Sequence, residues 1–158
     1  MSGKLDQEME TLWTLLFRIV TDLEDRIASH MAAHQLTPPQ FYVIKTLYEH
    51  DGRCAIGQIA REHHLTNATM TGLVKRLEKP DPPLVQRERS HLDRRSIDVI
   101  LTDAGYKRFD DIRFDLMKQV KSMLSLLDDD GRQTLINYAT YYTTFVIEQF
   151  PNQKPPEA

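Results

Sequence analysis

Apolar side chains recur at steps of three or four residues through the first 31 positions of the chain. This spacing places them on one face of a helix, so the pattern predicts a long amphipathic helix from Leu5 to Met31. A helix of this length cannot cover its apolar face against one small domain, so we expect a second chain to cover part of it. The repeating positions are Leu5, Met9, Leu12, Leu16, Ile19, Leu23, Ile27 and Met31.

Two shorter helices are predicted next. Thr37 precedes Pro38, a combination typical of an N-cap followed by proline at the first helical position, and Asp51-Gly52 ends this helix. A two-turn helix is predicted from Ile56 to Ala60, followed by a turn at residues 63–65.

The helix after this turn begins at Thr66, a candidate N-cap. Its apolar positions follow helical spacing and are expected to face inward, which leaves a small, hydrogen-bonding face outside. Two helices joined by a short turn, with small polar residues early in the second, predict a helix-turn-helix able to enter a major groove. The inward positions are Met70, Leu73, Val74 and Leu77, and the outward ones are Asn67, Ala68, Thr71, Gly72 and Lys75.

A hairpin is predicted after the helix-turn-helix. The segment Lys79-Pro80-Asp81-Pro82-Pro83 cannot continue a helix, because proline lacks the amide hydrogen. Residues 84–89 and 96–101 then alternate in the way that strands do, and Ser90 to Arg95 join them. A hairpin in this place, with Arg94 and Arg95 near its tip, is called a wing.

The rest of the chain predicts further helices. Thr102 can cap a long helix with an apolar stripe, which residues 128–131 interrupt before another helix begins. The predicted fold is therefore mainly α with a small β-hairpin wing. We expect residues 1–34 and 103–150 to form a helical dimerisation region, residues 35–102 a winged helix-turn-helix DNA-binding region, and residues 151–158 a flexible tail.

Composition and charge narrow the possible functions. The 158 residues carry a net charge of -3, but Gly72 to Arg95 holds 7 basic against 4 acidic side chains, so contact with phosphate is expected there. No apolar run approaches the roughly 18 residues of a spanning helix, and the first ten residues lack the apolar stretch of a signal peptide, so a cytoplasmic location is expected. No nucleophile with a base, phosphate loop or carboxylate pair occurs at recognisable spacing, which argues against an enzyme.

Two segments resemble the MarR-type winged helix-turn-helix transcription regulators of bacteria and archaea. Asp93-Arg94-Arg95-Ser96-Ile97-Asp98-Val99-Ile100-Leu101-Thr102 is similar to the family's wing signature D-x-R-x-x-x-V-x-L-T, and Gly105 follows it. Residues 65–78 are similar to the family's recognition helix. The resemblance covers nearly the whole chain, since the order and lengths of the helices also agree.

The resemblance implies an obligate homodimer that binds a palindromic site in double-stranded DNA, without a cofactor. It further implies a repressor that a small aromatic or phenolic ligand relieves. Arg95 would enter a minor groove, and Asp93 would pair with Arg95 and hold the wing in position. The full set of implied DNA-binding residues is Thr66, Asn67, Ala68, Thr69, Thr71, Lys75, Arg76, Arg94 and Arg95.

Several features have a second interpretation. A set of aromatic residues could line an effector pocket, and core packing explains them equally well. A winged-helix module that binds protein without DNA is the alternative function, although Lys75 and the wing arginines argue against it. The aromatic set is Trp13, Phe17, Phe41, Tyr48 and Phe109.

Metal and thiol chemistry is not expected. His30 and His34 lie one helical turn apart, but no third ligand is identifiable, so we interpret them as a solvated or interfacial pair and expect no metal site. Cys54 is the only cysteine, and we interpret it as a small buried residue.

Overall fold

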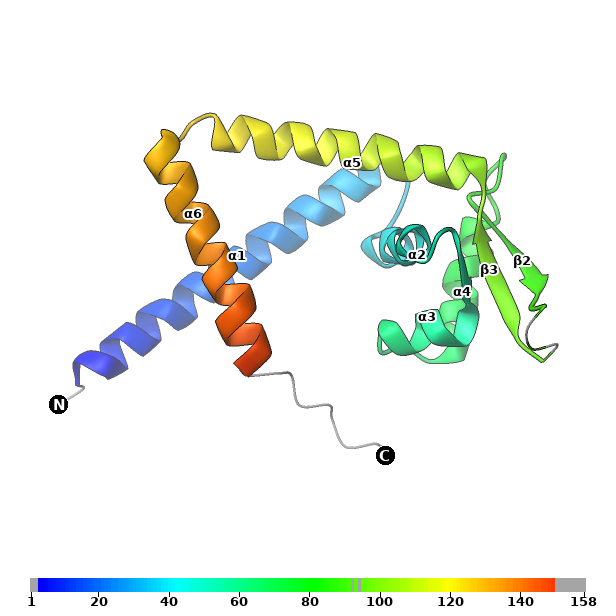
Figure 1. Ribbon diagram of the computed structural model, residues 1–158, viewed down its shortest axis with the longest axis horizontal. Coiled ribbons are helices and arrows are strands. Elements are labelled where there is room, and N and C mark those ends of the chain that lie inside the picture. The colour runs from blue at the N-terminus through cyan, green and yellow to red at the C-terminus, as the bar shows by residue number, and fades with distance from the viewer. Residues whose placement is uncertain (1–2, 92, 94, 150–158) are drawn as a thin grey trace. The chain divides into compact units, whose positions relative to one another are not determined.

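The computed structural model describes residues 3–91, 93 and 95–149, and it divides the chain into two compact units, Met1–Phe114 and Asp115–Ala158. The predicted tail at residues 151–158 lies outside the described residues. The first unit holds five helices or parts of helices and three strands (Figure 1). They are α1 (Lys4–Ala33), α2 (Pro38–Glu49), β1 (Arg53–Ala55), α3 (Ile56–Glu62), α4 (Asn67–Leu77), β2 (Val85–Arg89), β3 (Ile97–Leu101) and the first half of α5 (Asp103–Leu124).

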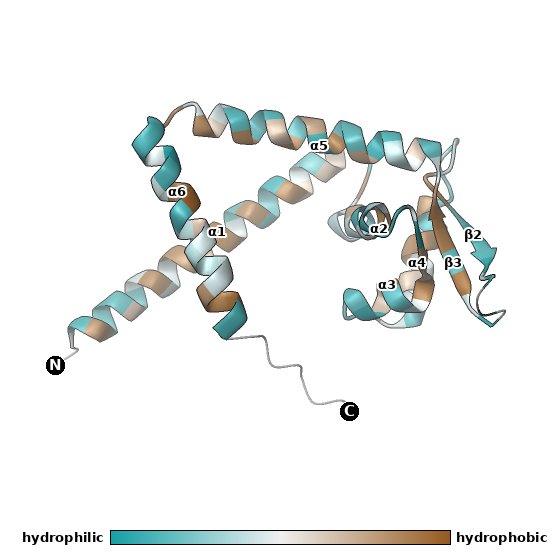
Figure 2. Ribbon diagram, viewed as in Figure 1, coloured by the Kyte–Doolittle hydropathy of each residue, from teal (hydrophilic) through white to brown (hydrophobic). Residues whose placement is uncertain are grey.

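Helix α1 confirms the long amphipathic helix predicted from the sequence. It begins after Gly3, whose N–H donates to the Asp6 carboxylate at 2.9 Å, and it ends at Ala33, with His34 as its C-cap. Figure 2 shows hydrophobic residues (brown) at intervals along the whole helix. Only Met31 of these thirty residues is buried, so the apolar face is uncovered over most of its length.

Helix α2 begins and ends as its sequence predicts. The Thr37 N–H donates to the Gln40 side-chain oxygen at 2.8 Å, and Pro38 takes the first helical position. Asp51 and Gly52 both have positive φ, at 54° and 84°. A Cβ at Gly52 would lie 2.0 Å from the Tyr106 hydroxyl, so both the backbone angle and the packing of α5 require glycine there.

Helices α3 and α4 form the predicted helix-turn-helix. His64 has a φ of 53° in the turn between them, and the Thr69 N–H donates to the Thr66 hydroxyl at 3.2 Å, which confirms the N-cap. The four predicted inward positions of α4 are all buried: Met70, Leu73, Val74 and Leu77.

The sheet has three antiparallel strands in the order β1-β3-β2. Strands β2 and β3 confirm the hairpin, each beginning one residue later than predicted, with Arg87 paired to Val99. Strand β1 was not predicted; it pairs Cys54 with Val99 on the other edge of β3. Its three residues are too few to show alternation, and only the central strand gives them a hydrogen-bonding partner.

The core of the first unit lies between α2, α3, α4 and the sheet. Ile44, Ile59, Met70, Leu77 and Val99 contribute fully buried side chains. Helix α5 closes over this core where it starts: the Gly105 N–H donates to the Thr102 hydroxyl, which confirms that predicted cap. A Cβ at Gly105 would lie 2.2 Å from the Leu84 carbonyl oxygen, so α5 and the start of the hairpin are in close contact.

The second unit contains the end of α5, helix α6 (Asp129–Tyr141) and a π-helical turn, η1 (Tyr142–Ile147). Asp128 caps α6 by accepting a hydrogen bond from the Gly131 N–H at 2.8 Å, so the predicted interruption is a helix boundary. No described residue of α6 or η1 is buried. Among the described residues, no helix is long and apolar enough to cross a lipid bilayer.

Candidate nucleic-acid interface

The outward face of α4 carries small side chains at its centre and cations toward its end. Rotation by 100° per residue places Ala68, Gly72 and Lys75 opposite the four buried positions. A Cβ added at Gly72 would meet no atom within 4 Å, which confirms that this position faces open space. Ala68 and Lys75 are exposed and Gly72 is half-buried. Because glycine has no side chain, the part of Gly72 that remains accessible is backbone.

The hydroxyl groups of α4 already have partners within the helix. The Thr66 and Thr69 hydroxyls lie 2.9 Å apart, and the Thr71 hydroxyl donates to the Asn67 carbonyl at 2.7 Å. Thr66, Asn67 and Thr69 are exposed, whereas Thr71 is half-buried. Thr66 and Thr69 therefore stabilise the start of the helix in the unbound protein, and each of the three hydroxyl oxygens retains lone-pair capacity for an external donor.

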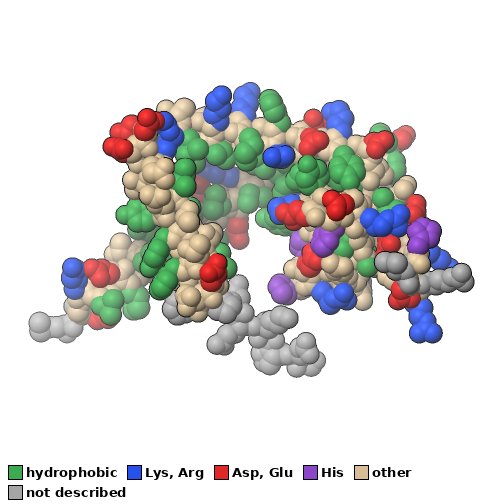
Figure 3. Space-filling model, viewed as in Figure 1, with side chains coloured by type: hydrophobic (Ala, Val, Ile, Leu, Met, Phe, Trp, Pro, Cys, Tyr) green, Lys and Arg blue, Asp and Glu red, His purple; other side chains and the backbone are tan. Residues whose placement is uncertain are grey.

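Four cations on α4 and the hairpin have no ion pair with any described residue: Lys75, Arg76, Arg89 and Arg95. All four are exposed. Figure 3 shows basic side chains (blue) at the outer end of the hairpin. Arg94, the remaining predicted cation of the wing, lies outside the described residues. Exposed cations on two neighbouring elements can neutralise phosphates of a polyanion.

Asp93 holds the backbone of the wing loop. Its carboxylate accepts a hydrogen bond from the Arg95 N–H at 2.9 Å, and its carbonyl accepts one from the Ser96 N–H at 2.8 Å. The family resemblance implies that Asp93 pairs with Arg95, and Asp93 bonds to the main chain of Arg95 rather than to its guanidinium. Asp93 thus fixes the turn and leaves the charge of Arg95 facing outward.

Two arginines that serve the hairpin were not identified in this role from the sequence. Arg53 on β1 donates to Glu88 at 3.0 Å and to Asp98 at 3.2 Å, and these hydrogen bonds raise its pKa. Arg87 on β2 pairs with Glu78 at the end of α4. Its partner lies across a proline-rich linker, so local alternation gave no signal for the pair.

The five aromatics proposed for an effector pocket fall into two separate groups. Tyr48 and Phe109 stack with ring centroids 4.3 Å apart, and Phe41 lies 6.0 Å from Phe109, inside the first unit. Trp13 and Phe17 contact each other at 4.5 Å on α1, where both are more than half exposed. The structure therefore does not bring the five into one pocket.

A different hollow lies between α1 and α2. It has a volume of about 370 Å³, and the walls combine apolar atoms with two carboxylates. This volume is at the lower end of the range typical of small-ligand sites. Its lining residues are Glu24, Asp25, Ile27, Ala28, Pro38 and Tyr42.

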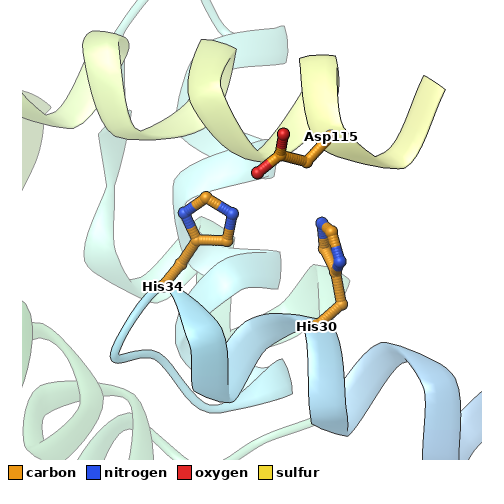
Figure 4. Close-up of side chains that lie close together, drawn as sticks. All are labelled: His30, His34 and Asp115. Atoms are coloured by element: carbon orange, nitrogen blue, oxygen red, sulfur yellow. The ribbon is translucent and has the colours of Figure 1, made fainter. Parts of the chain in front are cut away.

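His30 and His34 are neighbours at the end of α1. Their rings are 5.4 Å apart at an angle of 54°, and both side chains are half-buried (Figure 4). Asp115, also labelled in that figure, belongs to the second unit. The expectation that the chain holds no metal stays a prediction.

Cys54 is the central residue of β1, and it is buried, as predicted. Burial raises the pKa of its thiol to about 11, so the thiol stays protonated at neutral pH. A protonated, enclosed thiol is a poor nucleophile, which agrees with a packing role.

Sequence comparison places the wing and the helix-turn-helix in a known family. A family model described as MarR family matches residues 36–97. The HTH-type transcriptional regulator MhqR of Bacillus subtilis (strain 168) is 29% identical over 119 residues, which are 75% of this chain and 80% of MhqR. The HTH-type transcriptional regulator MgrA of Staphylococcus aureus is 36% identical over 70 residues, or 44% of this chain and 46% of MgrA. The expected class of non-enzymatic transcription regulator is confirmed.

Solved structures share the fold. The YusO protein of Bacillus subtilis superimposes with a TM-score of 0.74 at 22% identity, covering 90% of this chain and 99% of YusO. A Staphylococcus aureus MepR mutant bound to an oligodeoxyribonucleotide gives a TM-score of 0.63 at 20% identity, covering 85% of this chain and 97% of MepR. These likenesses confirm the predicted winged-helix fold.

Proposed function

Because this chain belongs to the MarR family of DNA-binding transcription regulators, we propose that it is a homodimeric repressor that binds a palindromic site in double-stranded DNA and is released by a small aromatic ligand. In this proposal residues 35–102 contact DNA. Residues 1–34 and 103–150 form the dimer.

The observation that carries the DNA-binding proposal is the set of exposed cations on α4 and the hairpin. Lys75 and Arg76 have no ion pair with described residues. The Arg95 guanidinium has none either, since Asp93 bonds to the main-chain N–H of Arg95. Helix α4 would lie in the major groove, with Asn67 and Ala68 against base edges, while Arg95 enters the adjacent minor groove. The MepR structure, which holds an oligodeoxyribonucleotide, supports this docking by similarity of fold.

The proposed DNA contacts combine polar and basic side chains. The helix would contribute contacts from its capped start to its basic end, and the wing would add two arginines. These residues are Thr66, Asn67, Ala68, Thr69, Thr71, Lys75, Arg76, Arg94 and Arg95.

The uncovered face of α1 supports the homodimer. Large apolar side chains along this helix are half or more exposed, and isolated soluble chains rarely leave such a continuous surface in water. A second copy supplies the same face by symmetry, and a two-fold dimer matches a palindromic site. The exposed positions of α1 are Leu5, Met9, Leu12, Trp13, Leu15, Phe17, Ile19, Val20 and Leu23.

Relief by a ligand is supported by the hollow between α1 and α2. It lies where α1, the proposed dimerisation helix, meets α2 of the proposed DNA-binding region. A ligand bound there would favour one position of α1 relative to α2 over others. Tyr42 offers an aromatic surface there, and it is 39% exposed.

The test is a mobility-shift titration of the full chain with the duplex that surrounds its own gene, at two salt concentrations and with competitor DNA. We expect saturable, competitor-resistant binding by a dimer that weakens as salt rises. Absence of DNA affinity at either salt concentration would contradict the proposal and favour a protein-binding module.

Lys75→Ala refines this test. If Lys75 neutralises a phosphate in each half-site, the slope of log K against log salt should fall by about 2 for the dimer. Arg26→Ala is a matched control, because Arg26 lies on α1 and pairs with Asp22. An unaltered slope for Lys75→Ala would remove this residue from the interface.

A further inference from the structure

We propose that Glu78 and Arg87 are positioning residues that fix the recognition helix α4 against the wing, so that Arg87 acts on DNA binding through Glu78 and contacts no phosphate. The inference rests on the proposed DNA-binding function. It assigns to one acidic and one basic side chain a shared role that their charges alone would not suggest.

The geometry of the pair is that of a two-point clamp. Arg87 Nε donates to Glu78 Oε1 at 2.9 Å, and Arg87 Nη2 lies 2.9 Å from Glu78 Oε2. Two parallel bonds between planar groups fix orientation as well as distance. The side chains are 35% and 24% exposed, so water screens this pair less than a fully exposed one.

The two residues sit where the relative angle of the DNA-contacting elements is set. Glu78 is the C-cap of α4, and Arg87 is the central residue of β2. Between these elements the chain makes a turn through Lys79 to Pro83, and the Leu84 N–H bonds to the Leu77 carbonyl at 3.0 Å. The clamp adds a side-chain connection to this backbone bond and to the packing of the sheet on the core, so it further restricts rotation of the hairpin relative to α4.

A second network holds the other side of the hairpin. Arg53 on β1 bonds to Glu88 on β2 and to Asp98 on β3, and Asp98 is buried. Arg87 and Glu88 are consecutive residues, so their side chains point to opposite faces of the sheet. Side-chain ion pairs therefore connect one face of the hairpin to α4, through Arg87, and the other face to β1, through Arg53.

Fixing this angle matters because α4 and the wing must meet neighbouring grooves together. A binding constellation tolerates errors of only about 0.5 Å and 10–20° in the placement of its groups. Loss of the clamp leaves every proposed DNA-contacting side chain in place and allows the wing to rotate. Affinity should then fall because the bound arrangement is populated less often.

Glu78→Gln distinguishes a positioning role of Glu78 from a purely electrostatic one, because the two roles predict opposite changes in DNA affinity. Removing a negative charge near DNA should strengthen binding if only electrostatics matters. If Glu78 positions Arg87, the same isosteric change should weaken operator binding by about tenfold. Thermal unfolding and sedimentation of the variant establish that it remains a folded dimer.

Arg87→Lys and Arg87→Ala provide the complementary measurement. Lysine keeps the charge but lacks the planar fork, so both variants should lose about tenfold in affinity with an unchanged salt slope. Arg87→Ala combined with Glu78→Gln should cost no more than either change alone. The matched control is Arg89→Ala, which removes a β2 cation that has no ion pair with described residues and should lower the salt slope without depending on residue 78.

Binding of Glu78→Gln that equals or exceeds that of the unaltered chain would overturn the inference, as would a lowered salt slope for Arg87→Ala. The proposed function fails by a different result, in which the unaltered chain itself does not bind DNA at either salt concentration. The two failures are therefore distinguishable within one titration series.

Discussion

Helix α1 and the region from α2 to β3 carry equally regular apolar patterns and bury them differently. In α1, Leu12 and Leu23 are 58% and 51% exposed, whereas Ile44 in α2 and Leu77 in α4 are fully buried. The helices of both regions have the spacing of an amphipathic helix. The difference shows that periodicity specifies an apolar face but does not specify whether the same chain or another one covers it.

Free energy favours covering the α1 face. Burial of apolar surface contributes roughly 25 cal/mol per Å², and the exposed face extends over five turns of helix. The helix-turn-helix has its core within one chain and can fold around it. Helix α1 needs a partner, so oligomeric state and DNA binding become linked.

The largest expected effect comes from charging the α1 face. Leu12→Glu combined with Leu23→Glu places carboxylates where the second chain is proposed to pack, and burying them unpaired is costly. Sedimentation should show a monomer at concentrations where the unaltered chain is a dimer, and operator affinity should fall by about a hundredfold or more.

Thr14→Glu is the control for that experiment. Thr14 lies on the opposite side of the same helix, where its hydroxyl bonds to the Glu10 carbonyl. The control should remain a dimer. A doubly charged variant that sediments as the unaltered dimer would show that this face is not the interface.

A smaller effect is expected from a cavity in the core. Ile44→Ala removes buried methyl groups from α2 and should lower the free energy of unfolding by about 2–5 kcal/mol in a urea titration. Because this contact lies within one chain, the loss should be the same at low and high protein concentration. The destabilisation caused by Leu23→Ala should instead be largest at high protein concentration, where the unaltered chain is a dimer, and should shrink on dilution. Equal concentration dependence for both variants would erase the contrast between the regions.

The sequence predicted what local chemistry determines. The caps at Thr37, Thr66 and Thr102 and the buried stripe of α4 follow from residues within one turn of each other. Strand β1 exists only because β3 offers it a partner far along the chain, with Arg53 opposite Ile100. Such long-range pairing leaves no local pattern.

The candidate site shows the same division. Exposure of Asn67 and Lys75 followed from helical rotation about the buried stripe. The Glu78–Arg87 pair could not be predicted, because the direction of the chain after the prolines decides which acid Arg87 meets. The aromatic set is divided between two places for a related reason: helical spacing does not say that Trp13 stays on the exposed α1 face while Phe41 enters the core.

The smallest effect is expected from Gly72→Ala, which should change protein stability and DNA affinity in opposite directions. Glycine inside a helix costs about 0.5–1 kcal/mol relative to alanine, and nothing in the fold requires it, because a Cβ would meet open space. Gly72→Ala should therefore raise the free energy of unfolding by about that amount in a urea titration. The methyl group would project from the centre of the outward face of α4, so operator affinity should fall if DNA approaches the backbone there.

Gly57→Ala provides the matched comparison for Gly72→Ala. Gly57 is also helical, and its added Cβ would make only ordinary contacts, at 3.7 Å from the Arg61 guanidinium and 3.8 Å from the Asn67 side-chain oxygen. It should stabilise the protein in the same way and leave operator affinity unchanged. If Gly72→Ala instead stabilises the fold and binds DNA as well as the unaltered chain, the groove does not reach the backbone of α4, and the side chains of α4 must supply the contacts of this helix with DNA.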